Sequence, residues 1–345
     1  RLYDEGFISQ DELEITTNKQ INLREKSNLF KKKASYFKEA VRREIIRQYD
    51  KTKLYAEGLT IMSTLNTRYQ NLAEDVFRKG IKNYDRQFKW RKPIGNFESI
   101  ENWNEKLANF AEPEGLYESI LGVVLNQEED NFKIGLSNGD IVELKPENMK
   151  ILSKNPKGLK NFFKIGDIIV LEKQRNREKE NLVLSQIPSV NGGMIVIENH
   201  SGRILAMVGG YDSSSEFNRV TQAYRQPGSA FKPIVYLAAL ENGFSPVSKI
   251  LDAPVVIKNP TDKRNWRPTN YGNKFYGEST LRLGIEKSRN LMTVRLAQKI
   301  GLDKVKNLSE DFEIYSDLPL LLSSSLGSVE TTLQKLSSAY SIIAN

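Results

Sequence analysis

Hydrophobic spacing changes twice along the chain, and this change constrains the fold more than any other feature. From Ser35 to Tyr49 apolar residues such as Phe37 and Val41 recur at the period of an amphipathic helix. From about residue 115 to 188, short apolar and alternating runs are typical of strands. After residue 189 two more strand-like runs precede a region of helices and loops. The 345 residues therefore predict a multidomain α+β protein.

The N-terminal part predicts helices joined by irregular segments. Residues 1–17 indicate a short helix-turn-helix that is broken at Gly6, with an N-cap signal at Ser9-Gln10-Asp11-Glu12. Leu59–Leu65 alternates between apolar and polar residues and predicts a strand. Asn66 then caps a helix that is expected to continue to about residue 85.

The middle part predicts a small closed barrel of the OB type. Asn138-Gly139 is the strongest two-residue hairpin signal in the chain. A second hairpin is expected around the charged loop Lys173–Glu180. The predicted strands are Ser119–Leu125, Phe132–Leu136, Asp140–Leu144, Gly166–Glu172 and Asn181–Gln186. Five short strands with turn signals between them favour a barrel that closes on itself.

The net charge of +8 lies within residues 1–92, which contain 21 Lys and Arg against 13 Asp and Glu. Such a part can face nucleic acid or an anionic membrane surface, and the basic helix at 35–53 could lie near lipid headgroups. Solvated helix faces are the simpler interpretation. An OB-type barrel also suggests nucleic-acid binding, but stacking platforms need several aromatic residues on one strand face. We expect no nucleic-acid partner, because the aromatic residues at 113–188 are only Tyr117, Phe132, Phe162 and Phe163.

The residue types present exclude several kinds of site. The chain has no cysteine, which excludes disulfides, thiolate metal sites and cysteine nucleophiles. Its one histidine, His200, lies in a turn between two strand-like runs, Met194–Glu198 and Ile204–Val208, and is interpreted as a solvated turn residue. One histidine cannot build a two-histidine metal site, and we expect no metal and no cofactor.

The strongest chemical signal is a Ser-x-x-Lys pattern after a Pro-Gly turn. In Arg225-Gln226-Pro227-Gly228-Ser229-Ala230-Phe231-Lys232-Pro233, the turn leads into the apolar helix expected at Ile234–Leu240. Ser229 then lies at a helix N-terminus, where free N–H groups favour a developing anion. Lys232, three residues on, shares its face and is the available base for the serine. A second copy, Ser35-Tyr36-Phe37-Lys38, is interpreted as solvated surface in the middle of a helix.

A Ser-x-Asn pattern supplies a second candidate element. It occurs at Ser153-Lys154-Asn155, at Ser189-Val190-Asn191 and at Ser288-Arg289-Asn290. Only the third lies between two expected helices, Thr280–Lys287 and Leu291–Lys299. A loop held between helices can fix catalytic groups rigidly, so Ser288 and Asn290 are the further candidate site residues.

These patterns resemble those of the class A penicillin-binding proteins, the bifunctional cell-wall synthases. The similar stretches are Phe217-Asn218-Arg219, Arg225–Pro233, Trp266-Arg267-Pro268-x-Asn270-Tyr271 and Ser288–Leu291. Residues 113–188 resemble the OB-like insertion of one branch of the family, and residues 1–17 resemble the end of its glycosyltransferase domain. The resemblance predicts four parts: a glycosyltransferase remnant at 1–20, a helical linker at 21–112, the OB-like barrel at 113–188 and the N-terminal part of a transpeptidase domain, of the serine β-lactamase-like fold, at 189–345.

The family's third transpeptidase motif, Lys-Thr-Gly, does not occur in the chain, and neither does Lys-Ser-Gly. The resemblance therefore implies a piece of a longer protein. A glycosyltransferase domain and a membrane anchor would precede residue 1, and the third motif would follow residue 345. We expect the 345 residues alone to be a slow catalyst.

The resemblance implies serine acyl transfer on the D-Ala-D-Ala end of peptidoglycan stem peptides. Ser229 would be the nucleophile and Lys232 its base, while Ser288 would relay a proton and Asn290 would hold the peptide amide. β-Lactams would acylate the same serine, and the location would be the periplasmic face of the bacterial inner membrane. A D,D-carboxypeptidase or β-lactamase shares Ser-x-x-Lys but not the upstream barrel. The remaining alternative is a non-catalytic docking module, with a periplasmic or outer-membrane regulator bound at the OB-like barrel.

Overall fold

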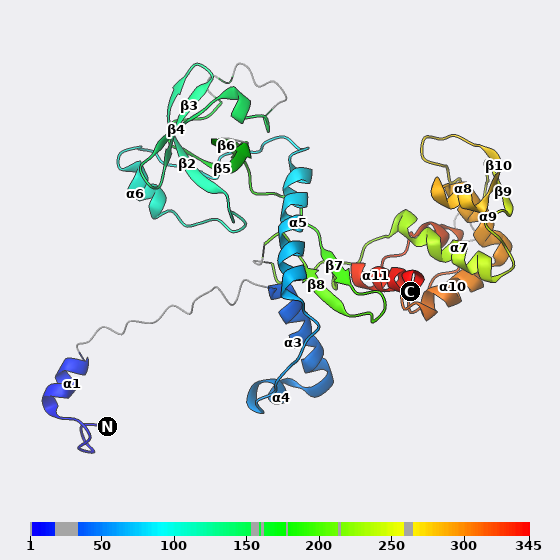
Figure 1. Cartoon of the computed structure of the whole chain (residues 1–345), viewed down its shortest axis with the longest axis horizontal. Coiled ribbons are helices and arrows are strands. Elements are labelled where there is room, and N and C mark those ends of the chain that lie inside the picture. The colour runs from blue at the N-terminus through cyan, green and yellow to red at the C-terminus, as the bar shows by residue number, and fades with distance from the viewer. Residues whose placement is uncertain are drawn as a thin grey trace.

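A computed structural model describes residues 2–17, 34–152, 159, 162–176, 179–212, 215–258 and 265–345. Figure 1 shows the long helix α5 near the centre, with the strands β2–β6 at one end and the hairpin β7–β8 beside it. The helices α7–α10 lie beyond α11, on the far side of that hairpin. Within the described residues no helix has both the length and the apolar character of a membrane span.

In the described part of the chain the helices alternate with three separate sheets. The α-helices are α1 (Gln10–Thr17), α3 (Ser35–Tyr49), α4 (Lys51–Ala56), α5 (Thr67–Asp85), α6 (Trp103–Ala108), α7 (Lys232–Glu241), α8 (Leu281–Glu286), α9 (Asn290–Ile300), α10 (Leu302–Asp311) and α11 (Leu333–Ala344). The 3₁₀ helices are η1 (Pro146–Asn148), η2 (Gly228–Phe231) and η3 (Leu322–Leu326). The strands are β1 (Gly95–Asn96), β2 (Ile120–Glu128), β3 (Asn131–Leu136), β4 (Ile141–Leu144), β5 (Asp167–Asn176), β6 (Lys179–Ser185), β7 (Met194–Ile197), β8 (Ile204–Val208), β9 (Lys249–Asp252) and β10 (Gly277–Thr280).

The helix predictions in the N-terminal part are largely confirmed. The helix predicted at Ser35–Tyr49 is α3 with the same bounds. Asn66 caps α5, since its side-chain oxygen accepts from the backbone N–H groups of Arg68 and Tyr69. Near the chain start, only α1 is helical among the described residues of 2–17; residues 2–6 form turns instead of the first predicted helix.

The strand predicted at Leu59–Leu65 is wrong. The end of the segment contacts β8 through hydrogen bonds that do not form a ladder in the described part of the chain. The backbone N–H of Asn66 donates to Leu205, and the Thr64 hydroxyl donates to the carbonyl of Ile204. Leu59 is 45% exposed and Ile61 is 40% exposed, so the alternation did not reflect a buried face. An alternating pattern without a partner strand is not enough to form a strand.

The middle strands form one antiparallel sheet with the order β1-β5-β2-β3-β4, and β6 pairs with β5. The Asn138-Gly139 turn joins β3 to β4, as predicted. The segment Lys173–Glu180 is not a loop: β5 continues to Asn176 and β6 begins at Lys179. The strands β4 and β6 contact each other, so the sheet curls. Among the described residues these two strands form no hydrogen-bonded ladder that would close it into a barrel.

The curled sheet encloses its own hydrophobic core. Two of the four aromatic residues considered for nucleic-acid stacking, Phe132 and Phe163, are buried inside it. Their rings pack edge to face, and Phe163 also packs against Trp90. Their faces are therefore used for packing. The buried members of this core are Val124, Phe132, Ile134, Leu144, Met149, Leu159, Phe163, Ile169, Leu171 and Leu184.

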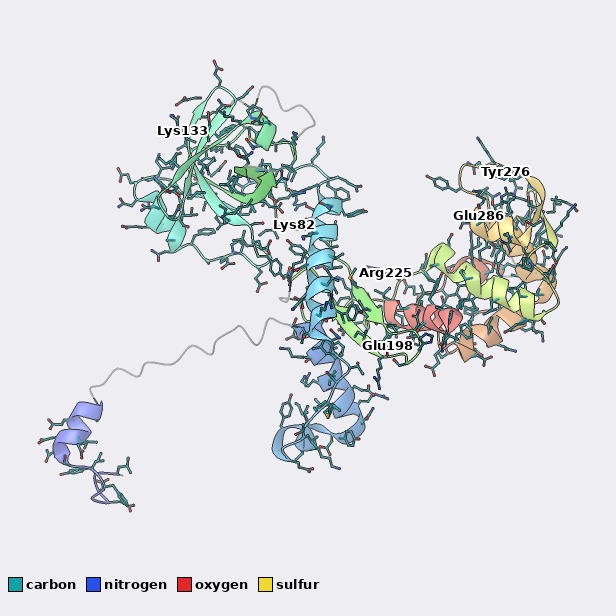
Figure 2. All side chains as sticks on the ribbon, in the orientation of Figure 1. Lys82, Lys133, Glu198, Arg225, Tyr276 and Glu286 are labelled. Carbon is teal, nitrogen blue, oxygen red and sulfur yellow. The ribbon has the colours of Figure 1, made fainter. Side chains whose placement is uncertain are left out.

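Helix α5 connects the sheet of β2–β6 to the hairpin β7–β8. Figure 2 labels Lys82 near the C-terminal end of this helix. Its ammonium donates to the Ser119 hydroxyl and lies 3.5 Å from the Glu172 carboxylate. Nearer its start, Ala73 and Phe77 pack in one cluster with side chains of β8. The same helix thus contacts both neighbouring parts of the chain.

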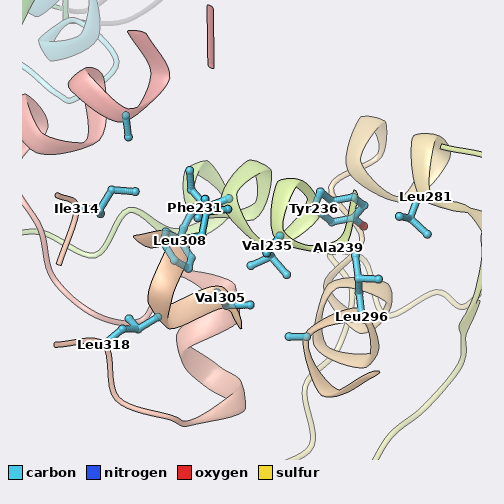
Figure 3. Close-up of a cluster of buried hydrophobic side chains, with 14 of the residues drawn as sticks. Phe231, Val235, Tyr236, Ala239, Leu281, Leu296, Val305, Leu308, Ile314 and Leu318 are labelled. Atoms are coloured by element: carbon cyan, nitrogen blue, oxygen red, sulfur yellow. The ribbon is translucent and has the colours of Figure 1, made fainter. Parts of the chain in front are cut away.

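The last part combines the β7–β8 hairpin with a helical cluster. The hairpin turn holds His200, which is exposed as predicted, with its Nδ1 2.8 Å from the side-chain oxygen of Asn345. Helices α7, α9 and α10 pack around a second core, shown in Figure 3. Phe231 is fully buried there, and its ring packs against Tyr315 with centroids 5.6 Å apart. This core fixes the start of α7, where the candidate serine lies.

Candidate active site

Ser229 lies in a short 3₁₀ turn that leads directly into α7. Gly228 has a φ of 54°, a conformation that glycine adopts readily, and its N–H donates to the carbonyl of Gly327. Pro233 occupies the first turn of α7, where its missing N–H costs no hydrogen bond. Ser229 is exposed, whereas Phe231, two residues later, is buried in the core. The turn therefore presents the serine to solvent from a fixed helix N-terminus.

Lys232 is the first residue of α7 and is only 1% exposed. Its ammonium donates to the Ser288 carbonyl at 2.6 Å, to the Ser288 hydroxyl at 3.0 Å and to Asn290 Oδ1 at 2.7 Å. All three acceptors are neutral. Burial lowers the pKa of Lys232 from 10.5 to about 8, because a desolvated ammonium is costly without an opposite charge. A useful fraction of the amine is therefore unprotonated near neutral pH, as a general base requires.

The loop between α8 and α9, together with the first residue of α9, supplies all three of these acceptors. Ser288 has a φ of 52°, a left-handed conformation that is uncommon for a residue with a Cβ atom. Asn290 starts α9, and its amide nitrogen donates to the carbonyl of Thr269 at 2.8 Å. With Nδ2 held by that carbonyl, Oδ1 is the atom that faces Lys232. The two expected helices around the loop are confirmed as α8 and α9.

The structure thus joins three of the four candidate residues through hydrogen bonds. Ser229 is three residues before Lys232, but its hydroxyl forms no hydrogen bond within the described part of the chain. Its backbone N–H also donates to no described backbone acceptor. Both groups are therefore available to a molecule that binds at the start of α7.

The other copies of the two patterns have different surroundings. Ser35 is the first residue of α3, so the interpretation as a mid-helix position is wrong, although Lys38 is exposed as expected. Ser189 donates to the buried carboxylate of Asp85, and Asn191 accepts from the N–H of Tyr211. Both have structural contacts. Ser153-Lys154-Asn155 lies outside the described residues.

Sequence reasoning missed four groups that support the site. The Thr269 carbonyl holds Asn290, and Arg289 and Asn270 hold the loop from below through the buried carboxylate of Asp252. Asn270 and Arg289 were visible as members of the quoted patterns, but nothing in their spacing assigned them a contact. A backbone carbonyl such as that of Thr269 leaves no signal in a sequence.

Comparisons with known proteins assign both folded regions to named families. Residues 192–345 match the family model described as the penicillin binding protein transpeptidase domain. Residues 90–190 match the model described as the penicillin-binding protein OB-like domain. The predicted combination of a transpeptidase domain with an OB-like domain is therefore confirmed.

Individual relatives align along the whole chain. A penicillin-binding protein 1A of Rickettsia conorii is 42% identical over 100% of this chain and 43% of its own length. The penicillin-binding protein 1A of Pseudomonas aeruginosa is 30% identical over the same shares. The crystal structure of penicillin-binding protein 1A from Haemophilus influenzae superposes with a TM-score of 0.79 at 26% identity, covering 100% of this chain and 50% of that one. The chain thus spans less than half the length of these curated relatives.

Proposed function

Because this chain belongs to the class A penicillin-binding protein family, we propose that it holds the acyl-transfer site of a peptidoglycan D,D-transpeptidase. One observation supports the proposal most: a buried lysine, Lys232, whose ammonium is bound by Ser288 and Asn290 and which lies three residues after an exposed serine at a helix start. Nucleophilic catalysis by serine needs such a base, and the one histidine of the chain, His200, lies in the turn between β7 and β8, hydrogen-bonded to Asn345.

In the first half of the reaction Ser229 attacks the stem peptide and becomes acylated. Its Oγ forms a bond to the carbonyl carbon of the penultimate D-Ala while Lys232 takes the hydroxyl proton. The bond from that carbon to the nitrogen of the terminal D-Ala then breaks, and Ser288 passes a proton from Lys232 to the leaving amine. The backbone N–H of Ser229 donates to the oxyanion, and Asn290 holds the peptide amide.

In the second half an amine of a neighbouring stem peptide attacks the acyl-serine. A new amide bond forms, the ester bond to Ser229 breaks, and the proton lost by the amine passes through Lys232 to the serine oxygen. A β-lactam presents a similar amide and acylates Ser229, but its opened ring stays covalently attached. Covalent labelling by a fluorescent penicillin therefore reports the first half of the reaction alone.

The direct test is penicillin labelling of the purified chain, followed by mass spectrometry of the adduct. We expect one adduct on Ser229, no adduct in Ser229→Ala, and labelling about 10²–10⁴-fold slower in Lys232→Met. The labelling rate is expected to rise with pH up to about pH 8, the pKa of Lys232, and then level off. The second Ser-x-x-Lys copy supplies matched controls, since Ser35→Ala and Lys38→Met are expected to label normally. An adduct that persists in Ser229→Ala, or no adduct on the unaltered chain, would refute the proposal.

The same family suggests roles for the remaining parts of the chain. We infer that residues 2–17 close a glycosyltransferase domain and that the OB-like part docks a regulator, at the periplasmic face of the inner membrane. Leu107 of α6 packs with Val123 and Ile168 of the sheet, which supports starting the OB-like part near residue 90 instead of 113. We propose the linker over residues 21 to about 89 and the transpeptidase part from about 189.

A further inference from the structure

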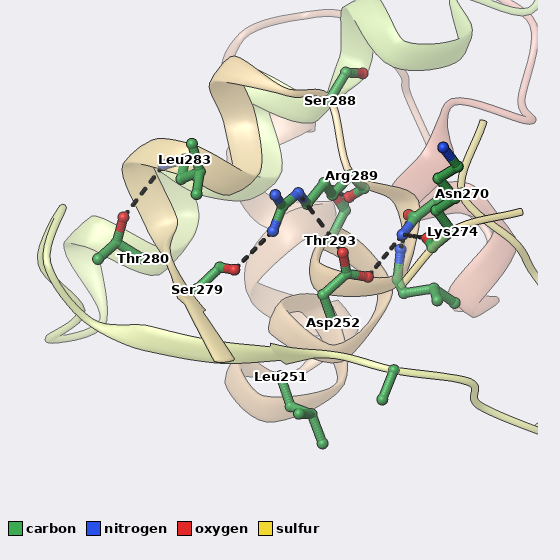
Figure 4. Close-up of polar contacts among 12 residues, drawn as sticks. Leu251, Asp252, Asn270, Lys274, Ser279, Thr280, Leu283, Ser288, Arg289 and Thr293 are labelled. Carbon is green, nitrogen blue, oxygen red and sulfur yellow. Dashed lines mark hydrogen bonds and ion pairs between the residues drawn. The ribbon is translucent and has the colours of Figure 1, made fainter. Parts of the chain in front are cut away.

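A buried polar cluster lies under the loop that holds Ser288 and Asn290, and the proposed reaction assigns it no role. Its centre is Asp252, the last residue of β9, which is fully buried. Figure 4 shows dashed lines from Asp252 to both Arg289 and Asn270, which are themselves 8% and 5% exposed. Buried charges are costly unless they are paired, so this arrangement calls for an explanation.

Asp252 first holds the loop through Arg289, the residue between Ser288 and Asn290. Arg289 Nε and Asp252 Oδ2 are 3.6 Å apart, an ion pair longer than a hydrogen bond. Neither atom has a hydrogen-bond partner in the described part of the chain, so the two atoms are held by this ion pair. The guanidinium also donates to the Ser279 hydroxyl at 2.6 Å and lies 4.2 Å from the ring centre of Tyr276.

Asp252 also holds Asn290 through Asn270. The Asn270 amide nitrogen donates to Asp252 Oδ1 at 2.7 Å, and its oxygen accepts from the N–H of Leu291. Thr269, the residue before Asn270, accepts from the Asn290 amide at 2.8 Å. One carboxylate therefore holds the residues on both sides of Asn290 and the segment that binds its side chain.

We propose that Asp252 is a positioning residue that fixes which end of the Asn290 amide faces Lys232. The inference rests on the proposed transpeptidase function. If the amide turned over, its N–H groups would face the Lys232 ammonium, and two donors would meet without an acceptor. Holding the Thr269 carbonyl against Nδ2 prevents this, and the ion pair to Arg289 keeps Ser288 in its left-handed conformation.

The first test measures penicillin acylation of the full chain carrying Asp252→Asn. We expect the acylation rate at saturating penicillin to fall about 10- to 100-fold, because small misplacements of a catalytic group have effects of this size. The penicillin concentration at half-maximal rate is expected to stay unchanged. Since Asp252 acts through Asn290, adding Asp252→Asn to Asn290→Ala should slow acylation by less than twofold. Fully multiplicative effects in this double variant would overturn the proposal.

A matched control separates positioning from general stability. Arg295 of α9 donates to the carbonyls of Leu251, Ala253 and Pro254, so it binds the same strand end, and in the described part of the chain it forms no ion pair with the Asp252 carboxylate. Arg295→Gln is expected to lower the melting temperature but not the acylation rate. A slowing by Arg295→Gln as large as that by Asp252→Asn would show that only the packing of β9 matters.

A second readout does not depend on activity. In the ¹⁵N-labelled chain, the side-chain NH₂ signals of Asn290 are identified by their loss in Asn290→Ala. We expect shifted, slowly exchanging signals in the unaltered chain and free-amide signals in Asp252→Asn. If Asp252→Asn unfolds the chain, Asp252→Asn/Arg289→Gln, which leaves no unpaired buried charge, replaces it. Unchanged Asn290 signals would refute the proposal, and a chain that shows the expected signals but no Ser229 adduct would refute the proposed function alone.

Discussion

At the scale of single residues, Lys232 has surroundings that are unusual for a lysine. It is almost completely buried, yet its three acceptors are uncharged groups of Ser288 and Asn290. Buried lysines usually need a carboxylate partner to keep their charge. Without one, burial lowers the pKa of Lys232 to about 8, so the same feature that prepares a base also opposes folding.

This opposition predicts how stability depends on pH. Between pH 8 and 10.5 the folded Lys232 has lost its proton while the unfolded one keeps it, so the unfolded state binds more protons. The free energy of unfolding should therefore rise with pH in this window, by about 1.4 kcal/mol per pH unit from this residue. Below pH 8 both states are protonated and the contribution is constant. Denaturant unfolding at several pH values measures the slope.

The variant Lys232→Met isolates this contribution. We expect the unfolding free energy of the unaltered chain, minus that of Lys232→Met, to rise by on the order of 3 kcal/mol from pH 8 to 10.5. Lys38→Met, which removes the exposed lysine of the other Ser-x-x-Lys copy, is the control for replacing a lysine with methionine. A flat difference for Lys232→Met would mean that the buried amine keeps its ordinary pKa.

At the scale of elements, the turn before α7 depends on a close contact with the end of η3. Gly327 has a φ of 72°, and a Cβ atom there would lie 2.3 Å from the carbonyl oxygen of Gly228. The Gly228 N–H donates to the Gly327 carbonyl at 3.1 Å. Two glycines therefore let η2 and η3 approach closely, and this approach places Ser229.

Replacing Gly327 with alanine should disturb both stability and chemistry. The left-handed backbone alone costs about 1–2 kcal/mol for a residue with a Cβ atom. The overlap with Gly228 must also move the turn that holds Ser229, so we expect a lower melting temperature and slower penicillin acylation. Gly243→Ala is the matched control: it has a φ of 88°, but nothing lies within 4 Å of its Cβ position. If both variants acylate at the normal rate, the η2–η3 contact does not position Ser229.

The same elements show what the sequence could predict. The helix at Ser35–Tyr49 was predictable because its spacing is local, and so was the start of α7, because Pro227-Gly228 announces a turn. The strand at Leu59–Leu65 failed because pairing depends on a distant partner, which the pattern cannot report. The four candidate site residues were recognisable from short patterns.

The support of the site could not be predicted in the same way. Asp252 resembles any acidic residue near a turn, since Pro254 follows it. Its partners Asn270 and Arg289 lie 18 and 37 positions further along the chain, and only the packing of β9 under α9 brings them together. Burial of a polar residue is a property of the tertiary structure, so spacing gives no sign of it.

At the scale of the whole molecule, Asp85 lies where the two large parts of the chain meet, the OB-like part (residues 90–190) and the transpeptidase part (residues 192–345). It lies at the end of α5, and its carboxylate forms an ion pair with Arg91 at 3.1 Å. It also accepts from the Gln186 amide and from the Ser189 N–H, in the segment between β6 and β7. Burial alone would raise the pKa of Asp85, but the hydrogen bonds from Arg91, Ser189 and Gln186 outweigh it and hold the pKa below its ordinary value.

Asp85→Asn should therefore loosen the junction between the two parts. An unpaired buried partner costs about 3–5 kcal/mol, and we expect about 2 kcal/mol here because Arg91 is 34% exposed. Hydrogen exchange at the Ser189 N–H should become about 30-fold faster.

Because the folded pKa of Asp85 is lowered, the stabilisation is complete above the unfolded pKa of about 3.9 and is lost as the pH falls through the folded value. The difference between the unaltered chain and the variant should therefore shrink in acid. Glu44→Gln, which breaks an exposed pair within α3, is the control and should leave Ser189 exchange unchanged. Equal exchange at Ser189 in the chain and in Asp85→Asn would show that the junction is held by packing and not by this carboxylate.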